Sequence, residues 1–184
     1  VSALLLPLQD TLRAAEDIAA LDRLAPGRLK VVVGVGSRVE EFEMFGRDRS
    51  QRGRSAEEAV RVILRAWEGE PFEMEGQTVR VTPPPASPPA SLLAIGGSVE
   101  ASARRAARLG LSFVPTLHDA AVAEVYHMEA RAQDFQGATC LRPSGPGLVR
   151  VSSDPDALWN KIGVHLLYDA RLYADWQHAD QRSS

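Results

Sequence analysis

The sequence predicts an α/β fold with about five parallel strands and an inserted β-hairpin. Short apolar runs alternate with segments of helical periodicity, and this alternation is typical of parallel strands joined by right-handed helical crossovers. The run Lys30–Val35 is β-branched with no polar alternation beyond the lysine, as in a strand that helices cover. With 45% hydrophobic residues in 184, the chain can bury one sizeable core, so we expect residues 1–184 to form a single domain.

The first predicted elements are a strand, a helix and a second strand. Ser2–Leu8 is apolar and reads as a short buried strand. Asp10 or Thr11 could cap the following helix, in which apolar residues recur at helical spacing. Pro26-Gly27 ends this helix, and the chain then enters the strand at Lys30–Val35.

A basic run and a helix come next. Residues 47–54 include four arginines, and either a solvated crossing or a basic rim beside an anionic ligand would explain them. Ser55 and Glu58 form a capping box, which predicts that a helix begins at Ser55 and continues to Trp67.

Residues 71–90 interrupt the main alternation. Around Glu75-Gly76 apolar and polar residues alternate, which predicts a hairpin, and five prolines then form a stiff connector. We expect the connector to return the chain to the sheet rather than to separate two domains. The other predicted elements are strands at Ser91–Ile95, Leu111–Pro115 and Leu148–Val151, and helices over Val99–Leu109, from His118 or Asp119 to about Asp134, and from Asp154 to Trp176 with a break at Gly163.

Two glycine turns follow predicted strands. Gly34 and Gly36 let the backbone pass close to another group, and the pair Gly96-Gly97 precedes Ser98 and a helix amino terminus. The free amides and dipole of a helix amino terminus favour an anion. From the residues alone, a structural role and a phosphate-binding role are about equally supported. A dinucleotide fingerprint is not favoured, because Val39 stands where its third glycine would be.

Composition bears on partners and location. A net charge of -3 with both signs interspersed favours neither nucleic acid nor an anionic membrane, and the apolar runs are far shorter than the roughly 20 residues of a spanning helix. The one cysteine, Cys140, excludes an internal disulfide and favours a reducing, cytoplasmic location. Because Val1 rather than Met stands directly against an apolar run, we expect the chain to be a piece of a longer protein.

Few side chains are candidates for catalysis. The four histidines lack metal-ligand spacing, so no metal site is expected. His118 lies just past a predicted strand end and is the candidate for a catalytic residue. Cys140 has no neighbouring histidine, which argues against a nucleophile. The aromatic residues expected to pack in the core are Trp67, Trp159, Tyr173 and Trp176.

Several motifs, taken in order, resemble the luciferase-like flavin-dependent monooxygenases. The resemblance implies a (β/α)8 barrel of the TIM type, here partial or truncated, because the family's first two strands and its last strand have no counterpart. Such a barrel usually takes about 250 residues. The motifs are Leu4-Leu-Leu-Pro-Leu-Gln, Arg13 to Leu29, Val33-Gly-Val-Gly, Glu41-Phe-Glu-Met-Phe-Gly, Arg52-Gly-Arg with the helix to Trp67-Glu-Gly-Glu-Pro-Phe, Ala94-Ile-Gly-Gly-Ser, Ala106-Ala-Arg-Leu-Gly and Asp169-Ala-Arg-Leu-Tyr-Ala-Asp-Trp.

The resemblance also implies a reduced flavin at the carboxyl ends of the strands, usually FMN and in some branches a deazaflavin coenzyme. Its phosphate would lie near the loops after the family's fourth and fifth strands. Ser2-Ala3 falls where some members have a non-proline cis peptide behind the flavin ring. The implied cofactor-binding residues are Ser2, Ala3, Gly36, Ser37, Arg38, Gly96, Gly97 and Ser98.

The implied function is that of an oxidoreductase in which reduced flavin and oxygen act on a small organic substrate, with a flavin reductase as a candidate partner. Two alternatives stay open. One is a deazaflavin-dependent dehydrogenase or reductase, and the other is a truncated, non-catalytic module that binds flavin or assembles with another chain. An incomplete barrel exposes strand edges and an apolar face, which favours a homo-oligomer.

Overall fold

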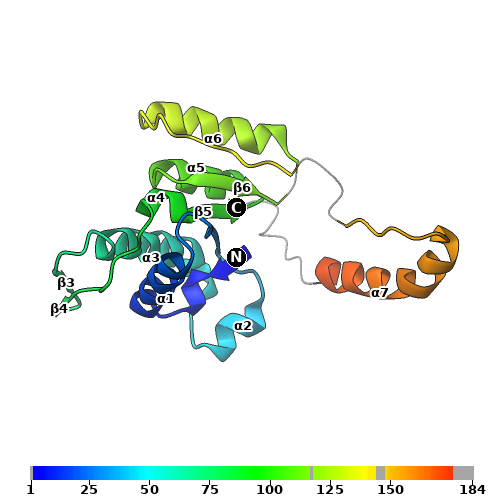
Figure 1. Cartoon of the computed structure of the whole chain (residues 1–184), viewed down its shortest axis with the longest axis horizontal. Coiled ribbons are helices and arrows are strands. Elements are labelled where there is room, and N and C mark those ends of the chain that lie inside the picture. The colour runs from blue at the N-terminus through cyan, green and yellow to red at the C-terminus, as the bar shows by residue number, and fades with distance from the viewer. Residues whose placement is uncertain (1, 117, 144–147, 176–184) are drawn as a thin grey trace.

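A parallel sheet of four strands, in the order β1-β2-β5-β6, forms the centre of the protein (Figure 1). The structure is a computed structural model that describes residues 2–116, 118–143 and 148–175. The order places the two earliest strands at one side and the two latest at the other, as in a barrel wall. The strands are β1 (Ser2–Leu5), β2 (Val31–Gly34), β5 (Leu93–Gly97) and β6 (Ser112–Pro115).

Helices cover one face of this sheet. Alternate strand residues such as Val33, Ile95 and Phe113 are buried in the core that these helices share. The intervening residues, among them Val32 and Val114, are half-buried and face a cavity instead. The packed helices are α1 (Thr11–Leu24), α3 (Arg52–Ala66), α5 (Glu100–Arg108) and α6 (Ala120–Ala132).

Helix starts follow side-chain caps. The Asp10 carboxylate accepts a hydrogen bond of 2.8 Å from the Arg13 amide, so Asp10 is the cap of α1. Asp119 caps α6 in the same way, through the Ala121 amide at 2.8 Å. The prediction that a helix begins at Ser55 is wrong, because Asp48 accepts from the Ser50 amide and starts the helical turns earlier. Two short helices before α3 were not predicted, α2 (Val39–Met44) and the 3-10 helix η2 (Arg49–Gln51).

The predicted hairpin is present as β3 (Phe72–Met74) and β4 (Gln77–Val79), which pair antiparallel. The connector after it packs onto α1. The buried Asp22 carboxylate accepts from the Ala86 and Ser87 amides at 2.8 and 2.7 Å. This arrangement returns the chain to the sheet through the one-turn helix α4 (Pro89–Leu92).

The predicted strand at Leu148–Val151 does not form, so the sheet has four strands rather than five. A segment earlier in the chain takes its place at the edge of β6. The Phe113 amide donates to the Thr139 carbonyl at 2.9 Å, and the Leu141 amide donates to the Phe113 carbonyl at 2.8 Å. Because these bonds occupy the edge of β6, residues 148–151 have no ladder to join there.

Helix α7 (Pro155–Asp175) runs without a break through Gly163, where an interruption was expected. A Cβ at Gly163 would lie 3.3 Å from the Trp159 ring, so the glycine makes room for the indole. Trp159 is 62% exposed and therefore is not a core residue, whereas Trp67 is 3% exposed, as predicted. Trp176 and the Tyr173 side chain lie outside the described residues. None of the described helices combines the length and the apolar character that a membrane span requires.

Candidate functional site

A cavity of about 480 Å³ opens at the carboxyl ends of the four strands. Parallel strands bring their carboxyl ends to one edge of a sheet, which is where ligands bind in such folds. Six residues predicted from the sequence line this cavity. They are Ala3, Gly36, Ser37, Gly96, Gly97 and Ser98.

The turn after β2 depends on glycine. Gly36 has a φ of +78°, which is strained for a residue with a side chain. A Cβ at this position would also lie 3.1 Å from the Phe42 ring. Gly36 thus lets the chain turn between the sheet and α2, and it keeps backbone exposed at the cavity wall.

The turn after β5 is packed still more closely. A Cβ at Gly96 would lie 2.8 Å from Cγ1 of Val32, and a Cβ at Gly97 would collide with the Ser102 side chain. Neither position has room for a side chain. The pair brings the strand end directly against the first turn of α5 and lets a ligand approach the backbone.

The amino terminus of α5 points its dipole at this cavity. Val99 precedes the helix without a side-chain cap, and its carbonyl accepts from the Ser102 amide at 3.0 Å. Helix geometry leaves the amides before Ser102 free of intrahelical bonds, and such amides bind anions. Ser98 adds a hydroxyl, and Arg52, from the predicted basic run, lines the same cavity. This donor set fits a phosphate group.

Two further cofactor-binding residues were predicted, Arg38 and Ser2. Arg38 precedes α2 and pairs with Glu41 at 3.5 Å, and it is not among the residues that line the cavity. Ser2 belongs to β1, but its side chain is outside the described part. Among the described residues the one cis peptide bond is Thr82-Pro83, so the cis bond considered at Ser2-Ala3 is not found.

The candidate catalytic residue His118, and Cys140, which was not expected to act as a nucleophile, are not among the residues that line the cavity. His118 is exposed, and its Nδ1 lies 3.1 Å from the Pro143 carbonyl oxygen, which engages this side chain with a loop. Burial raises the pKa of the Cys140 thiol, with a smaller opposing effect from Arg142, so the thiol stays protonated at neutral pH. No group of metal-ligating side chains occurs among the described residues.

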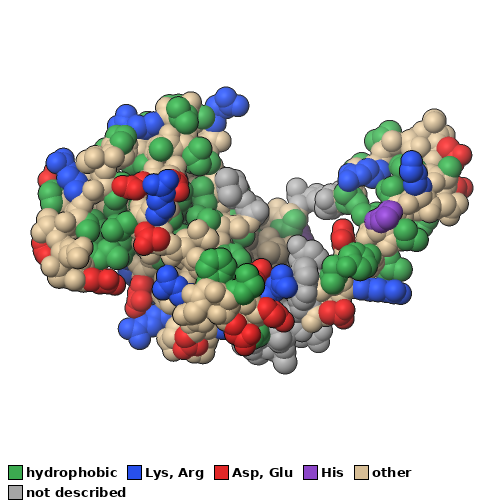
Figure 2. All heavy atoms as spheres, turned by 90° about the horizontal axis from the view of Figure 1, so that it is seen from below, with side chains coloured by type: hydrophobic (Ala, Val, Ile, Leu, Met, Phe, Trp, Pro, Cys, Tyr) green, Lys and Arg blue, Asp and Glu red, His purple; other side chains and the backbone are tan. Residues whose placement is uncertain are grey.

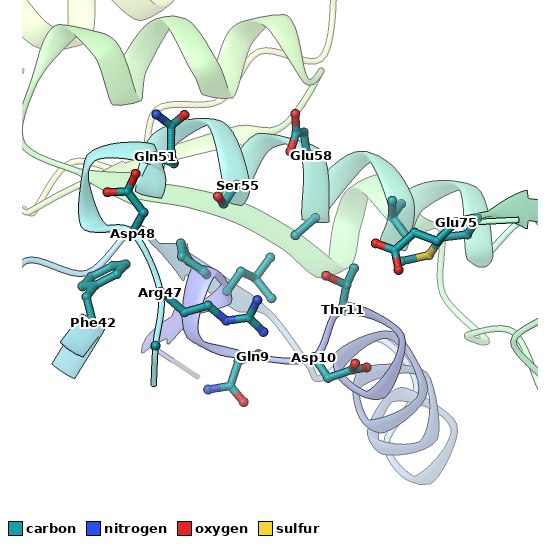
Figure 3. Close-up of a pocket in the computed structure, with 16 residues that line it drawn as sticks. Gln9, Asp10, Thr11, Phe42, Arg47, Asp48, Gln51, Ser55, Glu58 and Glu75 are labelled. Carbon is teal, nitrogen blue, oxygen red and sulfur yellow. The ribbon is translucent and has the colours of Figure 1, made fainter. Parts of the chain in front are cut away.

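A larger cavity of about 710 Å³ lies between the start of α1, α3 and the segment after α2 (Figure 3). In Figure 3, Arg47 extends into this space toward Gln9 and Thr11. Four carboxylates and one arginine line this larger cavity, so the net negative charge around it would repel a phosphate. None of the predicted cofactor residues with a described side chain lines it. The carboxylates are Asp10, Asp48, Glu58 and Glu75.

Fold and cavity together define an α/β protein of the partial-barrel type, with a candidate ligand site at the carboxyl edge of its sheet. The family described as luciferase-like monooxygenase matches residues 1–183. The chain belongs to this family.

Two related sequences match part of this chain. Uncharacterized proteins of Mycobacterium tuberculosis and Mycobacterium bovis are each 29% identical over 108 residues, which is 56% of this chain and 37% of theirs. The chain thus matches little more than a third of the length of these relatives.

Solved structures share the fold. The monooxygenase RslO1 from Streptomyces bottropensis matches with a TM-score of 0.75 and 21% identity, over 95% of this chain and 56% of that one. The oxygenating constituent of 3,6-diketocamphane monooxygenase from Pseudomonas putida, solved with FMN, matches with a TM-score of 0.59 and 23% identity, over 77% and 44%. An EDTA monooxygenase from Chelativorans matches with a TM-score of 0.63 and 18% identity, over 84% and 45%.

Proposed function

We propose that this chain supplies the phosphate-binding side of a reduced-flavin site in a flavin-dependent monooxygenase. The observation that carries the proposal is the cavity at the carboxyl edge, where two glycine turns and the amino terminus of α5 converge. The family supports the reaction class, and the relative solved with FMN supports the choice of flavin.

The roles of the residues follow from their chemistry. Ser98 and the first amides of α5 donate hydrogen bonds to phosphate oxygens, and Arg52 contributes positive charge. Val32 and Val114 present an apolar wall to the rest of the cofactor. The flavin, when bound, supplies the oxygen chemistry on a small organic substrate, while the protein holds and orients it.

A comparison of FMN with riboflavin tests the phosphate site, because riboflavin lacks the phosphate. In titrations followed by flavin fluorescence, we expect FMN to bind at least about tenfold more tightly than riboflavin. The difference comes from the charge-assisted hydrogen bonds that only the phosphate of FMN can accept. The variant Ser98→Asp should abolish this preference by repelling the phosphate and should leave riboflavin binding unchanged. Equal affinities for FMN and riboflavin, or no binding of either, would contradict the proposal.

A flavin-binding module without catalysis is the second candidate. It is favoured by the described residues that line the cavity, none of which is an aspartate, glutamate, histidine or cysteine that could transfer a proton. Oxygen uptake by the chain with reduced FMN separates the two functions. A deazaflavin coenzyme, a flavin reductase as partner and a cytoplasmic location remain predictions from the sequence.

A further inference from the structure

Arg105 of α5 is a largely buried arginine. Figure 2 shows that basic and acidic side chains are interspersed over the face in view. Exposed ion pairs, such as Arg131 with Glu124 at 2.8 Å, contribute little to stability. The Arg105 side chain, in contrast, is only 12% exposed. A guanidinium group that leaves water needs other acceptors in place of the water, because the burial of an unpaired charge is costly.

The buried Nε of Arg105 has no hydrogen-bond acceptor among the described residues. The carboxylate beside it belongs to Glu57, and the distance from Nε to the carboxylate oxygen is 3.8 Å. At this distance the two groups form an ion pair, but they are too far apart for a hydrogen bond. Since a buried donor without an acceptor costs free energy, the structure indicates that a further acceptor belongs here.

Positive charge is in excess around Arg105. Its neighbour Glu57 already accepts hydrogen bonds from Arg61 at 2.9 Å and from Arg108 at 3.1 Å. Burial lowers the pKa of Arg105, and the negative charge of Glu57 opposes this effect. The positive charges of Arg108 and Arg52 lower the pKa further. A single carboxylate therefore does not balance the arginines at this place.

A cavity of about 480 Å³ opens beside Arg105, between α3 and α5. Both carboxylates in its lining are engaged already, Glu57 as described and Glu58 by Arg54 at 2.8 Å. With Arg108, which contacts Glu57, four arginines stand against two carboxylates, which leaves an excess of two positive charges. An anion fits this imbalance. The lining residues are Gly53, Arg54, Glu57, Glu58, Arg61 and Arg105.

Gly53 leaves the space in which the guanidinium group lies. It belongs to the first turn of α3, and a Cβ at this position would lie 2.5 Å from Nη2 of Arg105 and 3.4 Å from its Cζ. The guanidinium group therefore lies directly over bare backbone at the wall of the cavity. Gly53 and Arg54 are also part of the basic run at residues 47–54, for which an anionic ligand was one of two explanations.

We propose that the cavity between α3 and α5 binds a small tetrahedral oxyanion, such as phosphate or sulfate, on the guanidinium group of Arg105. The planar fork of N–H donors on an arginine matches two oxygens of such an anion. The bound anion also offsets the excess positive charge beside Glu57. This cavity shares no lining residue with the one at the carboxyl edge of the sheet, so the proposal does not depend on flavin binding.

Equilibrium dialysis with labelled inorganic phosphate, at constant ionic strength, tests the site. Arg105→Met should weaken phosphate binding at least about tenfold, because methionine fills similar space without charge or donors. The binding that Arg105→Met removes should persist in Ser98→Asp, which places a negative charge at the other cavity. Phosphate should also raise the urea midpoint of the wild-type chain and leave that of Arg105→Met unchanged.

Gly53→Ala is a second variant, and it keeps every charge. Its methyl group would displace the guanidinium group, so phosphate binding should again weaken at least about tenfold. Alanine suits a helix better than glycine, so this variant should keep its fold. Arg104→Met is the matched control, because it removes an equal charge from the next residue, which pairs with Glu100 at 3.1 Å and does not line the cavity. This control should bind phosphate as the wild-type chain does.

The stability of Arg105→Met without phosphate separates binding from a structural role. Glu57 keeps two arginine partners in this variant, so its urea midpoint should be no lower than that of the wild-type chain. A large loss of stability would show that Arg105 is instead a structural partner of Glu57. Absence of phosphate binding, unchanged binding in Arg105→Met, or equal weakening by Arg104→Met would each overturn the proposal.

Discussion

At the scale of single residues, the candidate site depends on glycines, because a side chain at these positions would collide with neighbouring groups. Gly36 and Gly97 are both in contact with groups that a Cβ would displace, Phe42 in one case and Ser102 in the other. The sequence predicted the positions of these turns and their place at strand ends. It did not reveal the clash partners, because Phe42 and Ser102 reach the turns only through the packing of α2 and α5.

Gly97→Ala should weaken FMN binding at least about tenfold, because the new methyl group would push the first turn of α5 away from the cavity. Fluorescence titration of the variant measures the effect. The matched rescue is Gly97→Ala combined with Ser102→Gly, which removes the colliding side chain and should recover most of the affinity. Unchanged binding in the single variant would show that the turn does not contact the ligand.

Asp22 is a second residue whose role was hidden in the sequence, where it appears as one of several charges on α1. Burial would raise the pKa of its carboxyl group, but hydrogen bonds from Ser87 and Ala86 outweigh this effect and lower the pKa below the ordinary 3.8. The carboxylate therefore stabilises the fold at neutral pH. This stabilisation is lost as the pH falls through the lowered pKa.

Asp22→Asn should lower the urea midpoint at pH 7, and the difference from wild type should shrink as the pH falls from about 4, the unfolded-state pKa, through the lowered pKa of the native carboxyl group. Urea unfolding over a pH series measures this. Asp17→Asn is the control, because Asp17 lies exposed on the same helix. A pH-independent difference would mean that packing, rather than charge, gives Asp22 its role.

At the scale of elements, α3 and α5 are tied together by one carboxylate. Glu57 of α3 accepts from Arg61 at 2.9 Å and from Arg108 of α5 at 3.1 Å, and its side chain is 22% exposed. Burial would raise the pKa of Glu57, but these two arginines outweigh it and lower the pKa. Since α3 contributes Arg52 and α5 contributes its amino terminus, this contact fixes both walls of the cavity relative to each other.

Glu57→Gln should lower the free energy of unfolding by about 1–3 kcal/mol, because it removes charge-assisted hydrogen bonds to two arginines. The neighbouring Glu58→Gln should cost about 0.5 kcal/mol or less, since its contact with Arg54 is exposed on both sides. Urea unfolding at pH 7 compares the two. Equal losses would show that the contact between the helices adds nothing beyond a surface ion pair.

The sequence predicted elements well where local signals agreed with packing. The cap at Asp10, the hairpin and the strands that became β2, β5 and β6 all have strong local patterns. Prediction from the sequence was wrong where a tertiary contact determined which segment formed a strand or where a helix began. Residues 148–151 have a strand pattern, yet Thr139–Leu141 already occupies the edge of β6. Similarly, Asp48 starts the turns before α3 and overrides the capping box at Ser55.

At the scale of the whole molecule, the core that the described residues form lies within the first three quarters of the chain. Among the described residues, the buried apolar side chains run from Leu6 to Ala130. Helix α7 adds none to this core. The body around the sheet and α7 are therefore separable in energetic terms.

A fragment of residues 1–143 should keep the free energy of unfolding within about 1 kcal/mol of the full chain, measured at a dilution where the full chain is monomeric. A shorter fragment, residues 1–136, should lose about 1–3 kcal/mol, because it lacks the segment bonded to Phe113 and the Thr139 amide that donates to the Tyr126 hydroxyl. If the longer fragment fails to fold, α7 contributes to the core in a way that the structure does not show.

The two edge strands of the sheet, β1 and β6, differ in whether a further strand can pair with them. The edge of β6 is occupied by Thr139–Leu141, whereas β1 pairs with β2 alone among the described residues. A further strand can therefore pair with the outer edge of β1, whereas the edge of β6 is already occupied. A strand from another polypeptide that joined β1 would lie beside Ala3 and so at the wall of the cavity. A peptide that paired with β1 would therefore extend the sheet and change the shape of the cavity at the same time.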